Sequence, residues 1–238
     1  MGWEPLIPRE FSGSIPQEEF VARSFEWLQP FGFRADNTIA FVSVCRDELT
    51  LSLVELIEKT WGEAFIFSSL GGMLTLGKTG FLAAQHHAPI EGGRERYVYY
   101  ALPHIAIDVQ GTLGNYYRPG RQKPSHACGA LVAFQTELAD GALQLALDPD
   151  DMEQSVLKQR LLPRIRYGDV PDLLSLTRIA HAVILEDLER MIQLTVDPGR
   201  SDYGVFTGIQ IHVPEGRHIV WPGAAYAVKN GTKFTASG

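Results

Sequence analysis

The chain has 238 residues, of which 45% are hydrophobic and 21% charged. These are the proportions of an ordinary globular protein with a substantial core, and we expect one domain over residues 1–238. The net charge of −7, without a cluster of Lys and Arg, argues against nucleic acid or an anionic membrane as partner. It favours small molecules or proteins, and we expect a small-molecule substrate.

The sequence has no segment typical of membrane insertion or export. No apolar stretch approaches the roughly 18 residues of a membrane span, and Met1–Pro5 lacks the basic start and apolar core of a signal peptide. We therefore expect a soluble, cytoplasmic protein, with an organellar location after removal of a transit peptide as the alternative. In such a reducing compartment the two cysteines remain free thiols.

The N-terminal part predicts a helix, a buried strand and a second helix. Ser14 is the expected cap of the first helix, which ends at Pro30. Residues 38–44 are β-branched and apolar without interruption, as in a strand buried on both faces, and residues 48–61 carry leucines on one helical face. Cys45 therefore falls on a strand-to-helix turn.

The middle of the chain predicts more strands around a glycine-rich segment. These strands are expected at 64–67, 97–109 and 131–134, with the glycines between 71 and 80. Strands that alternate with helices favour a mostly parallel sheet, and in such sheets the strand ends carry the functional site. Cys45, His104 and Cys128 all lie near such ends.

The C-terminal third predicts helices and then antiparallel strands. Residues 151–162 and 171–196 have helical spacing, and residues 205–213 alternate as a strand does. Asn230-Gly231 between two apolar runs predicts a tight hairpin. The expected fold class is α/β, a mostly parallel sheet flanked by helices, with an N-terminal helix and a C-terminal helix plus strands.

Cys45, His104 and Cys128 are candidate zinc ligands. Two thiolates and one imidazole leave one tetrahedral position for water, whose pKa zinc lowers toward about 7. Both cysteines adjoin charged or glycine-rich turns, and a thiolate beside Arg46 at a helix N-terminus has a lowered pKa, as metal binding requires. Taken singly, a buried cysteine is usually a small hydrophobe and a lone histidine a core residue.

His126 is a rival ligand to His104. It lies two residues before Cys128, so on a strand both side chains face the same way. The residues alone do not separate the two histidines.

Residues 72–79 match the P-loop pattern of Gly, four residues, Gly-Lys-Thr, and follow a predicted strand. A phosphate cradle needs small residues so that backbone N–H groups converge, whereas Met73, Leu74 and Leu76 are bulky. Nucleotide hydrolysis is therefore a minor alternative.

Four segments together carry a resemblance to a known family. They are Val44–Glu48, Leu70–Gly80, Pro103–Asp108 and Arg118–Leu131. They resemble the limiting-carbon-dioxide-inducible B-type proteins, a divergent branch of the β-carbonic anhydrases. The resemblance implies a β-carbonic-anhydrase-like sheet, a homodimer, and zinc held by Cys45, His104 and Cys128. It implies reversible hydration of carbon dioxide to bicarbonate by zinc-bound hydroxide.

The sequence departs from ordinary β-carbonic anhydrases beside the first ligand. There the first cysteine is followed at +2 by Asp and at +4 by Arg; here Asp47 keeps +2, but Arg46 stands at +1. In the related enzymes this Asp can itself fill the open zinc position unless an Arg draws it away. We expect Asp47 and Arg46 to form this catalytic pair, with Arg118 or Arg121 as alternative partners of Asp47.

Two further expectations follow from the resemblance. Apolar side chains near the metal would hold the uncharged substrate, and the candidates are Phe67, Leu70 and Met73. Because a family likeness does not guarantee turnover, the alternative is a zinc-stabilised protein that binds inorganic carbon or forms complexes with little turnover.

Overall fold

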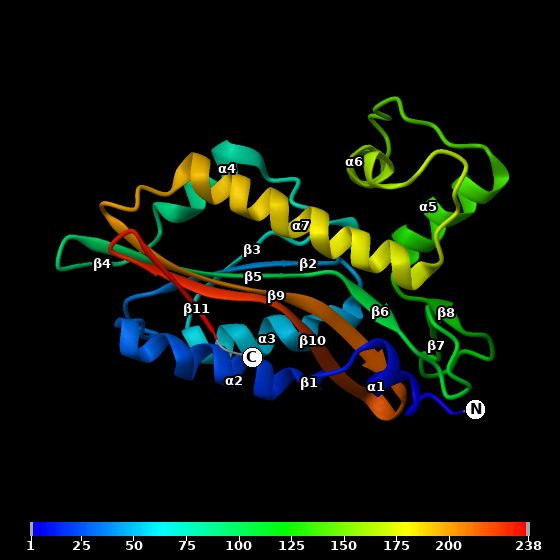
Figure 1. The fold of residues 1–238 in the computed structure, drawn as a ribbon, viewed down its shortest axis with the longest axis horizontal. Helices are drawn as coiled ribbons and strands as arrows, with labels where there is room; N and C mark the ends of the chain where they lie inside the picture. The colour runs from blue at the N-terminus through cyan, green and yellow to red at the C-terminus, as the bar shows by residue number, and fades with distance from the viewer. Residues whose placement is uncertain (1, 237–238) are drawn as a thin grey trace.

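A sheet of nine strands runs through the computed structural model, which describes residues 2–236 (Figure 1). Its strands are β1 (Ile15–Pro16), β2 (Ile39–Val44), β3 (Ala64–Ile66), β4 (Ile90–Glu91), β5 (Arg94–Leu102), β6 (His104–Ala106), β9 (Ser201–Val213), β10 (Arg217–Lys229) and β11 (Thr232–Thr235). The main order is β1-β10-β9-β5-β2-β3. A separate two-stranded ladder joins β7 (Asn115–Tyr116) to β8 (Ser125–His126).

The centre of the sheet is parallel. β2 runs parallel to both β3 and β5, and β9 runs parallel to both β5 and β6. β10 runs antiparallel to β9, and β1 and β11 pair antiparallel with its other side. All six residues of β2 are buried, which explains its unbroken apolar sequence. The expected α/β fold with a mostly parallel sheet flanked by helices is therefore confirmed.

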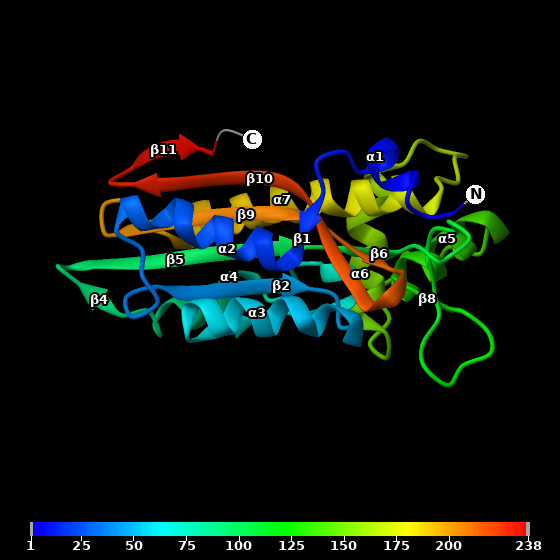
Figure 2. The same cartoon turned by 90° about the horizontal axis from the view of Figure 1, so that it is seen from below.

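Helices cover both faces of the sheet. They are α1 (Leu6–Glu10), α2 (Gln17–Leu28), α3 (Leu51–Trp61), α4 (Gly77–Gln85), α5 (Gly129–Asp140), α6 (Met152–Leu161) and α7 (Leu173–Thr195). α2 and α3 lie on one face, and α4 and α7 lie on the other (Figures 1 and 2). No helix within residues 2–236 is long and apolar enough to cross a membrane.

The alternation of side chains along each strand divides the core into two clusters. Phe41 of β2 packs in the cluster that includes α4 and α7, whereas Val42 and Val44 pack in the cluster with α2 and α3. Cys45 follows directly after β2 and belongs to the α7 side. The Cys45 thiol therefore lies at the end of the sheet where α5, α6 and the β7–β8 ladder are found (Figure 1).

Three predicted elements differ from the structure. The expected strand at 131–134 is part of α5, where Leu131 and Phe134 are buried at helical spacing; a run this short does not distinguish the two states. The expected strand at 97–109 is broken at Pro103, which separates β5 from β6. Ser14 does not cap α2, because β1 lies between them. The Ser14 hydroxyl instead donates a hydrogen bond to the Phe11 carbonyl.

Other predicted elements are confirmed. The helix expected at 48–61 is a 3-10 turn, η2 (Glu48–Thr50), continued by α3. The helices expected at 151–162 and 171–196 are α6, followed by one 3-10 turn, and α7. Asn230 and Gly231 turn β10 into β11 with φ of 51° and 75°, the left-handed region that this hairpin requires.

The segment that matches the P-loop pattern packs as part of the core. Met73 is only 1% exposed, in the same cluster as Cys45. Gly72 has φ of +78°, and a Cβ there would lie 3.2 Å from the Leu102 carbonyl oxygen and 3.6 Å from the Cys45 nitrogen. The glycines of this turn therefore allow close packing against the strand ends, and the geometry gives no support to phosphate binding.

We expect Gly72→Ala to destabilise the protein more than Gly77→Ala. Both glycines have positive φ, but the space around Gly77 is open within 4 Å, whereas a Cβ at Gly72 meets rigid backbone. The backbone strain common to both is about 1–3 kcal/mol, and only Gly72→Ala adds the steric contact. Urea denaturation measures both losses in the free energy of unfolding, and equal losses would contradict the close packing behind Cys45.

Candidate metal centre

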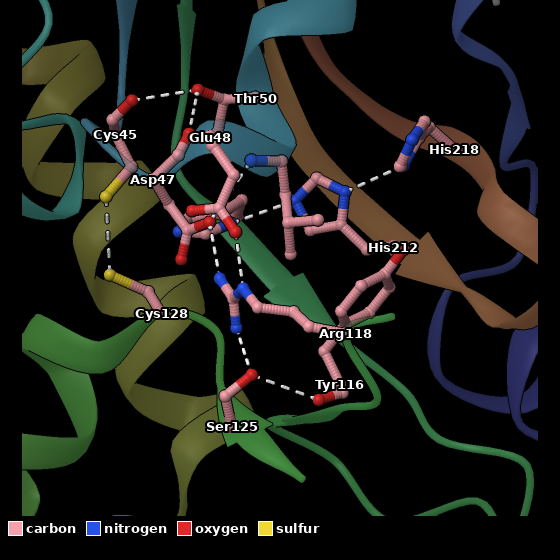
Figure 3. A network of polar contacts seen from close by, with 12 residues as sticks. Cys45, Asp47, Glu48, Thr50, Tyr116, Arg118, Ser125, Cys128, His212 and His218 are labelled. Carbon is pink, nitrogen blue, oxygen red and sulfur yellow. Dashed lines mark hydrogen bonds and ion pairs between the residues drawn. The ribbon is translucent and has the colours of Figure 1, made fainter. Parts of the chain in front are cut away.

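Three separate elements bring Cys45, His104 and Cys128 together. Cys45 follows β2, His104 is the first residue of β6, and Cys128 is the N-cap of α5. One ligand atom of each lies within 4.8 Å of the others, and the two sulfurs are 3.6 Å apart (Figure 3). The side chains are 4%, 0% and 1% exposed. Residues 59 and 24 positions apart in the sequence thus form one buried cluster, and the expected ligands are adjacent.

Local hydrogen bonds fix the backbone on either side of the two sulfurs. Cys45 pairs with Ser69 in an isolated parallel bridge, and its carbonyl accepts a hydrogen bond from Thr50 Oγ1 at 2.8 Å. The carbonyl of Cys128 accepts the first bond of α5, from the Val132 nitrogen at 3.1 Å. Both sulfurs therefore project from rigid positions at an element boundary.

The two thiols have opposite pKa shifts. The pKa of Cys45 is lowered to about 4, chiefly because the Cys128 thiol donates a hydrogen bond to its sulfur, with a smaller effect of His104. The pKa of Cys128 is raised well above its usual value by the adjacent Cys45 sulfur and by burial, against the opposing effect of N–H groups at the start of α5. Near neutral pH the pair therefore holds one proton and one negative charge.

His104 offers a ring nitrogen to the same space. Its Nδ1 is 2.9 Å from His212 Nε2, whereas its buried Nε2 has no hydrogen-bond partner within residues 2–236. His212 is completely buried, and burial holds its pKa well below the usual value, with a smaller effect of neighbouring His104, His218 and Arg118. An unpartnered imidazole nitrogen beside two sulfurs is a donor set that zinc binds, and three protein ligands leave one tetrahedral position open. The residues therefore fit a metal ion.

Asp47 pairs with Arg118, and the expected pair of Asp47 with Arg46 is wrong. Asp47 Oδ1 accepts hydrogen bonds from Arg118 Nη2 at 2.9 Å and from the Leu49 nitrogen at 3.1 Å (Figure 3). Arg46 instead binds Glu153 of α6 at 2.6 Å. Asp47 has extended backbone angles, and adjacent side chains on extended backbone point in opposite directions. The alternative partner Arg118 therefore takes this position.

Arg118 connects the turn after Cys45 with the β7–β8 ladder. It also donates hydrogen bonds to Glu48 and to Ser125. The bond to Glu48 lowers the pKa of that carboxyl group to about 2. Burial raises the pKa of Asp47, although the nearby His104 and Arg118 oppose this effect. Arg118 thus compensates two carboxylates beside the metal centre.

His126 does not join the cluster. It lies on β8 opposite Asn115, and its side chain is exposed. Among residues 2–236, the ligand set that the geometry forms uses His104. The sequence argument for His126 relied on a shared strand with Cys128, but Cys128 lies beyond the end of β8, at the start of α5.

Two histidines near the centre were missed from the sequence. His212 lies on β9 and His218 on β10, and the register places them opposite each other. A signal existed, because the apolar residues at 209, 211 and 213 alternate with Gln210 and His212. The face opposite those apolar residues was therefore polar, but alternation alone does not indicate which distant ligand it contacts.

We expect zinc binding at neutral pH to release about one proton from the Cys128 thiol. Both cysteines bind metal as thiolates, and only Cys128 has a pKa raised well above its usual value. Calorimetry in buffers of different ionisation enthalpy measures this release. Because the bound state lacks this proton, the apparent affinity should rise about tenfold per pH unit while the thiol stays protonated. Cys45→Ser should lose binding and His126→Ala should retain it; the reverse would exclude this ligand set.

Comparisons with known proteins identify the family of this chain. Residues 14–230 match the family described as limiting CO2-inducible proteins B/C beta carbonic anhydrases. The crystal structure of limiting CO2-inducible protein LCIB is similar to this chain at 37% identity and a TM-score of 0.81, over 98% of both chains. The structure of PtLCIB4, a homolog of LCIB, has the same fold at 24% identity and a TM-score of 0.85, over 97% of this chain and 98% of that one. The comparison with curated proteins gave no match. The chain therefore belongs to the limiting CO2-inducible B/C family, a β-carbonic-anhydrase-like branch.

Proposed function

We propose that this protein is a zinc-dependent carbonic anhydrase that reversibly hydrates carbon dioxide to bicarbonate. The observation that carries the proposal is the buried Cys45, His104 and Cys128 cluster with an unpartnered His104 Nε2, in a chain of this family. A zinc ion held there supplies a Lewis acid that lowers the pKa of water toward about 7 and so provides a nucleophile at neutral pH.

The three ligands have distinct roles in this proposal. Cys45 and Cys128 supply two negative charges, which match the charge of a divalent ion in a site with little access to water. His104 supplies a neutral nitrogen and keeps its other ring nitrogen for His212. The set leaves one position for water or substrate oxygen, as catalytic zinc sites require.

Asp47 and Arg118 form the charged pair beside this position. An unpaired Asp47 carboxylate would compete for the ion, and the hydrogen bond from Arg118 engages one of its oxygens. We infer that Arg118 has the role that the sequence pattern gave to Arg46. Asp47 would then orient water at the site and accept its proton, because a carboxylate with a raised pKa is suited to proton transfer.

The apolar surroundings suit the substrate class. Cys45 and Cys128 belong to the same buried cluster as Phe67 and Met73, two of the candidates for holding carbon dioxide. A site that excludes water favours an uncharged, apolar molecule and strengthens charge interactions at the metal. As a further proposal, the chain acts as a homodimer, which light scattering tests.

A second candidate function is binding of inorganic carbon, or complex formation, with little turnover. The observation that favours it is the burial of all three ligands, none of which is more than 4% exposed. Turnover needs an open path for water and bicarbonate, whereas a structural metal ion does not. Stoichiometric zinc without measurable hydration would favour this second candidate.

Stopped-flow hydration assays on zinc-loaded protein test the first candidate. We expect Arg118→Met to lower kcat/KM by about tenfold or more, because Asp47 then loses the donor that holds it away from the ion and in place to accept a proton. Arg121→Met, in the same loop but exposed, is the matched control and should change little. Arg46→Met tests which arginine pairs with Asp47. A loss of kcat/KM as large as that of Arg118→Met would contradict the observed Asp47–Arg118 pair. Activity no greater than that of Cys45→Ser would defeat the proposal.

A further inference from the structure

Three imidazoles form a continuous hydrogen-bonded chain that begins at the metal centre. His104 Nδ1 lies 2.9 Å from His212 Nε2, and His212 Nδ1 lies 2.9 Å from His218 Nδ1. Figure 3 shows the bond between His212 and His218 on neighbouring strands. The residues come from β6, β9 and β10, so three strands of one sheet contribute one histidine each.

The register of the sheet aligns the three histidines. His104 lies opposite Gln210 and Ala106 opposite His212 in the β6–β9 pair, and His218 lies opposite His212 in the β9–β10 pair. The neighbours Ile105 and Ile211 face the α7 side, so the histidines project from the opposite face, toward α2. His104 and His212 are completely buried and His218 is partly exposed. The chain therefore leads from the buried cluster toward the surface.

The number of protons on three neutral rings fixes the direction of these bonds. A neutral imidazole carries one N–H, and its other nitrogen accepts. If His104 Nε2 gives its lone pair to a metal ion, the proton of that ring must be on Nδ1 and must be donated to His212 Nε2. His212 then carries its proton on Nδ1 and donates it to His218 Nδ1. The opposite order would place a proton on His104 Nε2, where it would occupy the lone pair that the ion needs.

We propose that His212, itself held by His218, is a positioning residue that fixes the tautomer and ring orientation of His104 for metal binding. The inference rests on the proposed metal site but not on carbon dioxide turnover. His212 acts through His104 and touches no substrate. A partner of this kind, which accepts the N–H of a ligating histidine, typically contributes about 10- to 100-fold to metal affinity.

Burial explains why His212 has no simple substitute. Its side chain is completely buried, and its ring stands nearly perpendicular to the Tyr116 ring, with centroids 6.4 Å apart. Water has no free access to replace it as acceptor for His104 Nδ1. Loss of the ring would leave that N–H without a partner or turn the His104 ring away from the two sulfurs, and both outcomes weaken metal binding.

Paired variants separate positioning from packing. His212→Leu removes the acceptor, whereas His212→Gln keeps an amide oxygen that can accept from His104 Nδ1. His181→Leu is the matched control. His181 is a half-buried histidine of α7 that forms a hydrogen bond with Thr207 of β9 and has no bond to His104, His212 or His218 among the described residues. His218→Leu and His218→Gln repeat the comparison one step outward, at a partly exposed position where the fold is less affected.

The experiment measures zinc affinity by competition with a chromophoric chelator, for the full chain and each variant. We expect about 10- to 100-fold weaker binding in His212→Leu, a smaller loss in His218→Leu, and affinity within about threefold of the natural protein in both Gln variants and His181→Leu. Long-range proton–nitrogen NMR of the zinc-loaded protein should show the His104 proton on Nδ1.

Three results would overturn the proposal. They are unchanged zinc affinity in His212→Leu, an equal loss in His212→Gln and His212→Leu, or a proton on His104 Nε2 in the loaded protein. If His212→Leu does not fold, the His218 pair and the tautomer measurement decide the question. Zinc binding with these differences but without hydration would leave this inference standing and defeat the proposed enzyme; absence of zinc binding in the natural protein would defeat both.

Discussion

The structure depends on one interaction, the approach of two buried sulfurs to 3.6 Å. Two thiolates at this distance in a site that excludes water repel each other by several kcal/mol, even at an effective dielectric constant of about 20. The opposite pKa shifts of Cys45 and Cys128 express this constraint, because without a cation the pair retains a proton. A divalent ion bound there would remove the repulsion, and its binding free energy would then stabilise the fold that brings the sulfurs together. The proposed chemistry of the site and the stability of this end of the sheet would therefore be coupled.

The two faces of the sheet meet at this centre. Cys45 and Cys128 belong to the core cluster on the α7 side, whereas the His104 side chain projects toward α2, as its neighbour Ile105 faces α7. Within the sheet these faces are separated by backbone. At the centre they are not, because β2 ends at Val44, opposite Leu102 of β5, and His104 lies beyond that end. A metal ion held there would join the two layers, and the end of β2 at Val44 is the feature of the backbone that brings the Cys45 thiol and the His104 ring together.

The sequence predicted the elements better than it predicted their contacts. The buried strand before Cys45 and the long C-terminal helix were readable because their apolar patterns extend over many residues. The short segment after Cys128 was read as a strand because four apolar residues do not distinguish a strand from one turn of helix. The candidate ligands were selected through a family resemblance, since nothing in the spacing separates His104 from His126. His212 was missed because its role depends on the register of β6 against β9, which pairs residues more than a hundred positions apart.

The turn after Cys45 shows why the position of an arginine in the sequence was a poor guide to its partner. Arg46, Asp47 and Glu48 follow one another, but extended backbone at Asp47 sends Arg46 away from it. Arg46 then binds Glu153, whose carboxylate also accepts a hydrogen bond from the Leu70 nitrogen at 2.9 Å. This bond fastens α6 to the glycine turn behind the metal centre. The cation that Asp47 requires comes instead from Arg118, 71 positions later, on the loop that ends near Cys128. The adjacent arginine thus has a structural role, and the distant one has the electrostatic role, because charge compensation depends on distance in space and not on order along the chain.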